Sequence, residues 1–389
     1  MFDIDIIIPC YGKSKLISKG IAVLASQWKS KLIHITLVDD CSPNTDCHYQ
    51  DLIEKYQDDI DIRVIVMPEN SGQGLTRQYG IDHTDREWFM FMDEDDMYAS
   101  GVAISQFIQA AYLHNANVNQ DGTIPLDEKG KPVRHDGPNL ALISAPLFEF
   151  DDQHTHVIPA ENEIWLNSKL YNRNFIKKHN IRFNKAQSRH AEDYYFMSCF
   201  FYALHHDPEY IAGYMPNDGL FYLWYPNPES QSRVDPHYPF MLSGYTMDGS
   251  VNILKYIREC KSIEKTEGLE KEFNNRLLNM TVYSYYTFLS FLEHIRGTDY
   301  IPKLTMDWEL LRDACDTLRK MTAERWAEYK YEQKIDELYK VRNHSDVHKP
   351  EHIDIEFDDY ILNGMDAFSW DLDKLLTTKE QTDEPSNSN

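Results

Sequence analysis

Three clusters of acidic residues have the types and spacing to bind a metal ion or to move a proton. They are Asp93-Glu94-Asp95-Asp96, Asp39-Asp40 and Glu192-Asp193. Carboxylate oxygens are preferred ligands of Mg²⁺ and Mn²⁺, and a carboxylate can also act as a general base. An Asp-x-Asp pair alone is weak evidence in a chain with 63 acidic residues, because many such pairs lie in solvated turns.

Two of these clusters follow segments that are predicted to be buried strands. Residues 33–38 and 87–92 are apolar and stop at Asp39 and Asp93, as expected for strands buried on both faces. Further strands are predicted at 3–9, 62–67, 139–150 and 219–225, and helices at 14–28, 48–57, 101–113, 164–180 and 192–206. This alternation predicts an α/β fold with a mainly parallel central sheet. Ligands of such sheets bind beyond the carboxyl ends of the strands, where both clusters lie.

The sequence changes character at about residue 240. Glycine becomes scarce, and residues 248–260, 268–296 and 306–342 show helical periodicity. Residues 117–138 are predicted to form a turn-rich insertion. We therefore predict an α/β domain at 1–240, a helical C-terminal domain at 241–376 and a disordered polar tail at 377–389. The helical region is expected to shape an acceptor site or to mediate assembly into a homo-oligomer.

Composition restricts the class of partner. The 389 residues include 39 basic and 63 acidic ones, for a formal net charge of −24. This charge repels nucleic acid and anionic lipid. No apolar stretch approaches the roughly 18–20 residues of a membrane helix, so no transmembrane segment is predicted. The six cysteines form no C-x-x-C pair and are expected to be reduced, which predicts a cytoplasmic protein.

Four segments resemble the inverting family-two glycosyltransferases of the GT-A fold, in that family's order and spacing. They are IDIIIPCYG at 4–12, VDDCSP at 38–43, ENSGQGLTRQYGI at 69–81 and FMFMDEDDMY at 89–98. The resemblance covers about residues 1–235. It implies a GT-A type nucleotide-diphospho-sugar transferase domain that moves a sugar from a nucleotide-sugar donor, a UDP-sugar by preference, with Mn²⁺ or Mg²⁺.

The resemblance implies donor-binding roles for the ends of the first two strands. Pro9 and Tyr11 would line the pocket for the base and ribose. One Asp of the pair binds uracil in relatives, and we favour Asp39 for this contact. Asp40 would either touch the nucleotide or cap the following turn.

The glycine-rich segment and the acidic turn would complete the donor site. Gly72 would permit a tight backbone, and Arg77 would face the nucleotide or diphosphate; a salt bridge to the acidic turn is the alternative for Arg77. Asp93 would touch the ribose and a metal ion, and Asp95 would bind the metal. Asp96 is a second metal candidate or a helix cap, and Glu94 is interpreted as a spacer.

The segment from residue 164 to 196 resembles the family's acceptor region. Asp193 would be the catalytic base, and Glu192 would orient it or touch the acceptor. Two acids in the first turn of a helix are also favourable for purely structural reasons. An unperturbed carboxylate has a pKa of about 4, so Asp193 is expected to be ionised at neutral pH.

Residues 219–233 resemble the strand and loop that follow. There Ser230, Ser232 and Arg233 match positions that approach the donor phosphates, and a guanidinium group can grip phosphate oxygens. A mobile loop with an ordinary surface Arg is the alternative. The acceptor is expected to be a hydroxyl group on a glycan or another carrier.

Three other functions remain open at this point. They are a catalytically silent nucleotide-sugar-binding or scaffold protein of the same fold, a nucleotidyltransferase, and a glycosyltransferase acting on modified nucleic-acid bases. The intact Asp93, Asp95 and Asp193 argue against the first. Glu192-Asp193 favours an acceptor over nucleotidyl transfer, and the net charge argues against nucleic acid.

Overall fold

The computed structural model describes one compact part of the chain, which lies within Met1–Leu277. The described residues are 2–12, 14–43, 49–114, 128, 137–150, 155–185, 187–189, 191–225, 249, 252, 253 and 256. Most of the predicted insertion and helical C-terminal domain, and all of the tail, lie outside them, so their boundaries stay predictions. None of the helices in the described ranges is long and apolar enough to cross a membrane.

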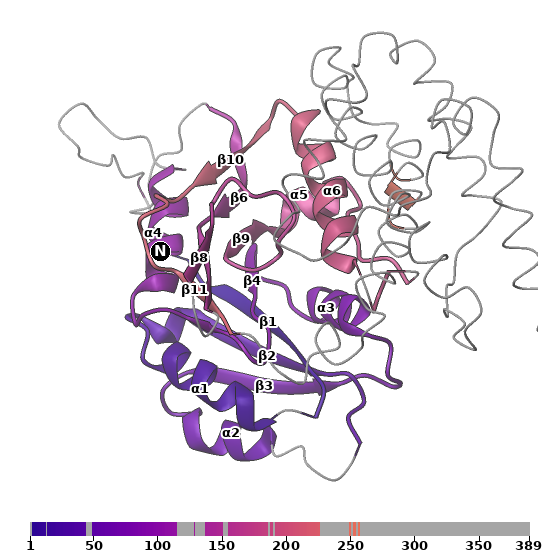
Figure 1. Cartoon of the computed structure of the whole chain (residues 1–389). Helices are drawn as coiled ribbons and strands as arrows, with labels where there is room; N and C mark the ends of the chain where they lie inside the picture. The colour runs from indigo at the N-terminus through magenta and orange to yellow at the C-terminus, as the bar shows by residue number, and fades with distance from the viewer. Residues whose placement is uncertain are drawn as a thin grey trace, which may run out of the picture. The chain divides into compact units, whose positions relative to one another are not determined.

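A seven-stranded sheet forms the centre, with the strand order β10-β6-β9-β4-β1-β2-β3 (Figure 1). Its strands are β1 Ile4–Cys10, β2 Ile33–Asp39, β3 Asp61–Val66, β4 Trp88–Phe91, β6 Asn139–Ser144, β9 Lys169–Asn172 and β10 Tyr210–Tyr214. Strand β9 runs antiparallel to β4 and β6, whereas the other pairings are parallel. Strand β9 therefore begins at the edge where its neighbours end, and the prediction of a mainly parallel sheet is confirmed.

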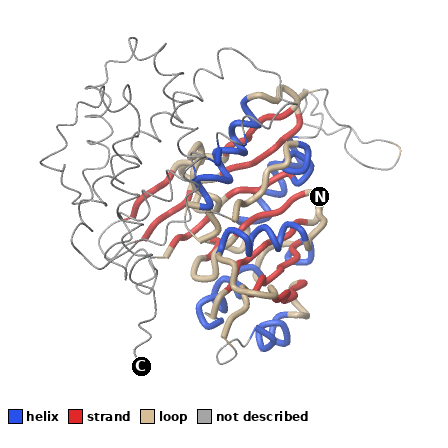
Figure 2. Tube along the Cα trace, turned by 90° about the vertical axis from the view of Figure 1, so that its right-hand side faces the viewer, coloured by secondary structure: helices blue, strands red, loops and turns tan. Residues whose placement is uncertain are grey.

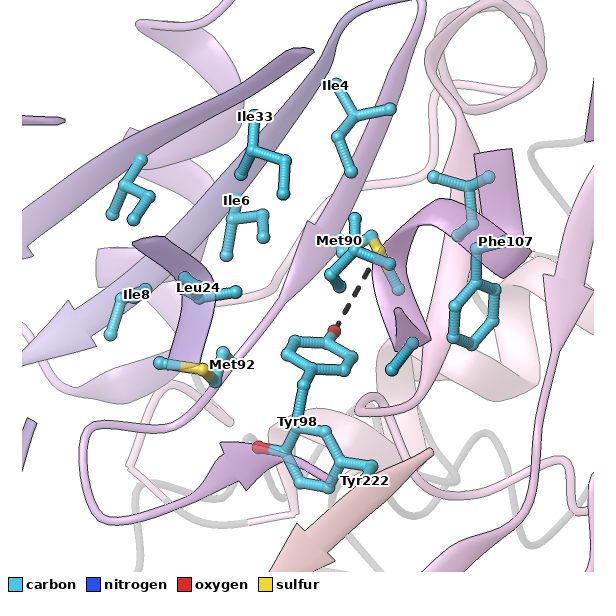
Figure 3. Packing of buried hydrophobic residues seen from close by; sticks show 14 of the residues in the cluster. Ile4, Ile6, Ile8, Leu24, Ile33, Met90, Met92, Tyr98, Phe107 and Tyr222 are labelled. Carbon is cyan, nitrogen blue, oxygen red and sulfur yellow. Dashed lines mark hydrogen bonds between the residues drawn. The ribbon is translucent and has the colours of Figure 1, made fainter. Parts of the chain in front are cut away.

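Helices cover both faces of this sheet (Figure 2). They are α1 Ser14–Ala25, α2 Tyr49–Tyr56, α3 Gln73–Asp82, α4 Ala103–His114, α5 Arg173–Lys178 and α6 Glu192–His205, with a short 3-10 helix at Ser30–Leu32. On one face, alternate residues of β1 such as Ile6 pack in a buried cluster with Leu24 of α1 and Phe107 of α4 (Figure 3). On the other face, Phe91 of β4 contacts Phe196 of α6.

A second, four-stranded sheet has the order β5-β11-β7-β8. Its strands are β5 Met97–Tyr98, β7 Leu147–Phe150, β8 Thr155–Ile158 and β11 Tyr222–Trp224. The rings of Tyr98 and Tyr222 meet edge to face at 5.1 Å (Figure 3). Since β5 begins directly after residues 93–96, this small sheet anchors the acidic turn.

Two predicted elements were wrong. The single strand at 139–150 is divided into β6 and β7, because residues 145 and 146 leave the ladder. The helix at 164–180 is instead strand β9 followed by the six-residue helix α5. Asn172 stops helix formation upstream, since it keeps an extended backbone and its side chain caps α5 by accepting from the Asn174 N–H at 2.9 Å.

Candidate active site at the carboxyl edge of the sheet

The acidic turn between β4 and β5 is held in place by strand β11. The hydroxyl group of Tyr222 accepts a hydrogen bond from the Asp93 backbone N–H at 3.1 Å and donates one to Asp96 at 2.9 Å. The other carboxylate oxygen of Asp96 accepts from the Tyr225 N–H at 3.0 Å. Desolvation, followed by repulsion from Asp93 and Asp95, raises the pKa of Asp96 well above its usual range. Both oxygens of Asp96 thus bond to residues of β11 or the residue after it, and its role as a metal ligand or helix cap stays a prediction.

Asp93 lies at the centre of a hydrogen-bond network. One carboxylate oxygen accepts from Arg77 at 2.6 Å and from Gln73 at 3.3 Å, and the other accepts from Asn167 at 2.9 Å. The side chain is still 21% exposed, so a ligand can reach it. Asp95 is half-buried on the same turn.

Arg77 connects the acidic turn to the first turn of α6. Its guanidinium group pairs with Asp93 and also with Glu192, at 2.9 Å, while only 2% of the residue is exposed. Burial works to lower the pKa of Arg77, but the two carboxylates outweigh this effect and raise it. The alternative interpretation of Arg77, a salt bridge to the acidic turn, is confirmed. This arrangement joins a predicted donor-side acid to a predicted acceptor-side acid.

Asp193 lies beside Glu192 in the first turn of α6, and one of its oxygens accepts from the Tyr194 N–H at 2.7 Å. Desolvation and the negative charge of Glu192 raise the pKa of Asp193 to about 7. The expectation of full ionisation at neutral pH was therefore wrong, because it used the pKa of a solvated carboxylate. A general base works best with a pKa near the working pH, so the shift suits that role.

The two aspartates at the end of β2 have different partners. Asp39 accepts hydrogen bonds from the backbone N–H, at 3.1 Å, and the hydroxyl group of Ser42, so it closes its own turn. Asp40 reaches across to the glycine-rich segment, where it accepts from the N–H groups of Ser71 at 2.7 Å and Gly72 at 2.9 Å. The turn-capping role considered for Asp40 thus belongs to Asp39.

The glycine-rich segment docks against the residues that precede α6. Gly72 has a φ of 88°, and a Cβ there would lie 2.6 Å from a side-chain carbon of Arg189. A Cβ on Gly74 would lie 2.9 Å from Cβ of Glu192. The Gly74 N–H donates to the Ser188 carbonyl oxygen at 2.7 Å. Both glycines are therefore needed for close approach between the predicted donor and acceptor segments.

The remaining predicted donor residues lie at the end of β1. Pro9 is buried within the strand, opposite Val38, and Tyr11 is 47% exposed just beyond it. The Tyr11 N–H donates to the Glu94 carboxylate at 3.2 Å, so Glu94 ties β1 to the acidic turn and is more than a spacer. Ser230, Ser232 and Arg233 lie outside the described residues.

The carboxylates fit a metal that is shared with a ligand better than a metal held by the protein alone. Within the described ranges, no group of three or more His, Cys, Asp or Glu residues could hold a metal ion. Mg²⁺ at nucleotide sites commonly takes one or two carboxylates, with phosphate and water as its other ligands. The exposed part of Asp93, next to Asp95, meets that lower requirement.

Several residues of this network were not predicted, and three of them lie far in sequence from the acids or glycines that they contact. They are Asn167, Ser188 and Tyr222. No local pattern could have identified Asn167 or Tyr222, because their contacts depend on strand order. Ser188 lies four residues before Glu192, so its position placed it near the predicted acceptor segment, but its residue type did not indicate a role.

Comparisons with known proteins agree with this geometry. Residues 5–190 match the family model for glycosyl transferase family 2. A comparison with curated proteins found no match. Among solved structures, S. aureus TarS 1-349 in complex with UDP has a TM-score of 0.53 at 16% identity, over 83% of each chain. The same protein in complex with UDP-GlcNAc has a TM-score of 0.52 at 14% identity, over 82% of this chain and 81% of that one.

A longer S. aureus TarS structure has a TM-score of 0.53 at 15% identity, and the match covers 82% of this chain but 49% of that one. At these identities the likeness concerns the fold. The family match, the strand order and the acids at the carboxyl edge agree with one another: residues 5–190 match the glycosyl transferase family 2 model, and the described domain has the GT-A fold.

Proposed function

We propose that this protein is a glycosyltransferase that moves a sugar from a UDP-sugar to a hydroxyl group of a glycan or another carrier, with inversion and with a divalent metal. The observation that carries the proposal is the bridge formed by Arg77 between Asp93 and Glu192. It holds an acid of the proposed donor site next to the acid pair of the proposed acceptor site. Transfer between two substrates requires such a junction.

The donor side would bind nucleotide and metal. Asp39, Tyr11 and Pro9 would face the base and ribose, and the solved TarS complexes with UDP and UDP-GlcNAc support uridine as the first base to test. Mn²⁺ or Mg²⁺ would be held by Asp95 together with Asp93, and would neutralise charge on the leaving diphosphate. Asp96 is left out of this set because it is only 1% exposed, whereas 21% of the Asp93 side chain is exposed.

The acceptor side would supply the base. Inversion follows when the acceptor oxygen attacks in line, opposite the leaving nucleotide diphosphate. The attacking hydroxyl group must lose a proton, which the ionised form of Asp193 would accept. Glu192 would orient this reaction through its bond to Arg77, and its charge helps to raise the pKa of Asp193.

We also propose a cytoplasmic location, where nucleotide sugars are available, and assembly into a homo-oligomer through the helical C-terminal region. Cys10, Cys41 and Cys199 are not paired in disulfides, which is compatible with a reducing compartment. Size-exclusion chromatography with light scattering on the full chain and on a chain ending at residue 240 tests the second point. Loss of the oligomer in the shorter chain is expected, and equal masses per chain would contradict it.

A donor screen tests the central proposal. The full chain is incubated with UDP-, GDP- and TDP-sugars, with and without EDTA, and nucleotide release is followed. Release from a UDP-sugar that EDTA abolishes is expected. Release that survives EDTA would overturn the metal requirement, and no release from any donor would overturn the enzyme assignment in its present form.

Two variants divide the proposed roles. Asp193→Asn should bind UDP-sugar as the wild type does and lose transfer, because an amide accepts no proton at neutral pH. Asp95→Ala should weaken metal-dependent donor binding. Retained transfer in the first variant, or unchanged donor affinity in the second, would contradict the respective role.

A further inference from the structure

Polar groups without partners gather where β9 begins. Buried polar side chains are nearly always hydrogen-bonded. Lys169 is nevertheless only 1% exposed, and its side-chain amine has no hydrogen bond or ion pair with any residue in the described part of the chain. The hydroxyl oxygen of Ser144 and the side-chain carbonyl oxygen of Asn167 are also buried without a partner. This cluster plays no part in the catalytic roles proposed above.

The topology brings this cluster to the edge of the active site. Because β9 is antiparallel to its neighbours, its first residue, Lys169, lies where β6 ends at Ser144, and these two residues face each other across the ladder. Paired residues point to the same face of a sheet. Tyr171 is on that face as well, and its hydroxyl group contacts the sulfur of Met197 in α6, the helix that begins with Glu192 and Asp193.

The cluster is also linked directly to the donor side. While the carbonyl oxygen of Asn167 has no partner, its amide nitrogen donates to Asp93 at 2.9 Å. The side chain of Asn167 is thus fixed by the acidic turn at one end and offers an acceptor at the other.

The backbone between Asn167 and Lys169 is strained, and the Lys169 amine is buried without compensation. Ser168, between the two, has a φ of 60°, a left-handed conformation that non-glycine residues rarely adopt, and it is fully buried with its hydroxyl group bonded to the Pro146 carbonyl oxygen at 3.1 Å. Desolvation lowers the pKa of Lys169 to about 7, which reflects an amine held away from water and from any counter-ion. Strain and uncompensated burial at the edge of a site are typical of functional positions.

We infer that Lys169, Ser144 and the carbonyl oxygen of Asn167 form a subsite that hydrogen-bonds the hydroxyl groups of the transferred sugar. The inference rests on the proposed function. The groups offer an amine, a hydroxyl and a carbonyl oxygen, and this mixture of donors and acceptors suits a neutral polyol. The direct link of Asn167 to Asp93 places the subsite on the donor side, so we assign it to the donor sugar in preference to the acceptor.

Binding of a nucleotide with and without its sugar tests this subsite. The affinities of UDP and UDP-GlcNAc, and of GDP and GDP-mannose as a second pair, are measured with Mn²⁺ for the full-length wild type, Lys169→Met and Ser144→Ala. Lys169→Met should weaken binding of the nucleotide sugar about tenfold, the usual effect of losing one strong hydrogen bond, while the free nucleotide binds within twofold. Methionine fills a similar volume without a charge, so the melting temperature should stay equal or rise.

Lys178→Met is the matched control, because Lys178 pairs with Asp207 and Glu209 at the end of α5. It should change neither affinity. The subsite is overturned if Lys169→Met binds sugar-bearing and sugar-free nucleotides with the same ratio as the wild type, or if only the KM of the acceptor changes. If the wild type binds neither pair, the proposed function itself fails, and the subsite assignment with it.

Discussion

The hydroxyl group of Tyr222 donates a hydrogen bond to the carboxylate of Asp96 over 2.9 Å, and the same oxygen accepts one from the Asp93 backbone over 3.1 Å. The acidic turn therefore takes its shape from a strand of the small sheet. Tyr222→Phe should remove both bonds and leave the buried Asp96 less satisfied. Since residues that orient metal ligands typically contribute 10–100-fold to metal affinity, we expect the Mn²⁺ concentration for half-maximal transfer to rise about tenfold.

Tyr98→Phe is the control for this prediction. Tyr98 is also fully buried, and its hydroxyl group donates to the Phe91 carbonyl oxygen at 3.1 Å. Both variants should lose about 1–3 kcal/mol of stability, measured by urea unfolding. Only Tyr222→Phe should change the metal dependence of transfer. An equal shift in both variants would mean that general loosening, and not the bond to the turn, sets metal affinity.

Arg77 should be a large contributor to both stability and transfer. Arg77→Met leaves Asp93 and Glu192 as neighbouring half-buried acids without their shared cation, and removing one partner of a buried ion pair costs about 3–5 kcal/mol. The double variant Arg77→Met/Glu192→Gln should recover part of this loss, because one stranded charge is gone. Urea unfolding of the wild type, both single variants and the double variant checks this. Strictly additive losses would show that Arg77 and Glu192 are not coupled.

The raised pKa of Asp193 predicts the pH dependence of transfer. The base must be ionised, so kcat/KM should rise with pH and level off above about 7. The rising limb of this pH profile should correspond to the loss of a single proton. Glu192→Gln removes a neighbouring negative charge and should move this limb to lower pH, whatever it does to the maximal rate. A limb near pH 4 in the wild type would show that Asp193 is solvated like an ordinary carboxylate.

Gly72 combines an unusual backbone with a lack of space, and these two effects can be separated. Gly12 also has a positive φ, of 70°, but nothing lies within 4 Å of the position that a Cβ would take. Gly12→Ala should therefore cost about 1 kcal/mol through backbone strain alone. Gly72→Ala should cost a further 1–3 kcal/mol or so, since its Cβ would collide with Arg189 and Ser188. Equal losses in thermal or urea unfolding would contradict the close-approach argument.

The sequence predicted the parts of the fold that local patterns control. β-Branched runs identified β1 and β2, and the acidic residues at the ends of β2 and β4 placed Asp39 and Asp93 at one edge of the sheet. Strand β9 was missed because its four residues lie inside a stretch with helical spacing. The two-residue strand β5 is too short to show any period.

The sequence predicted most of the acids of the site, but it did not predict most of the hydrogen bonds that hold them in place. Aspartates and glycines can be identified from their spacing, but the partners that fix them come from elsewhere in the chain. Asn167 is 74 residues from Asp93, and Tyr222 is 126 from Asp96. The pKa of Asp193 likewise depends on burial by folding, which the residue type alone does not reveal.

The contact between the glycine-rich segment and the residues before α6 has a practical consequence for engineering. Any side chain at Gly72 or Gly74 would occupy space that Ser188, Arg189 and Glu192 already fill. A segment transplanted into positions 188–192 from a family 2 glycosyltransferase would therefore have to bring its own matching glycine-rich segment. The glycine-rich segment and the residues before α6 would have to be replaced together, although more than 100 residues of chain separate them.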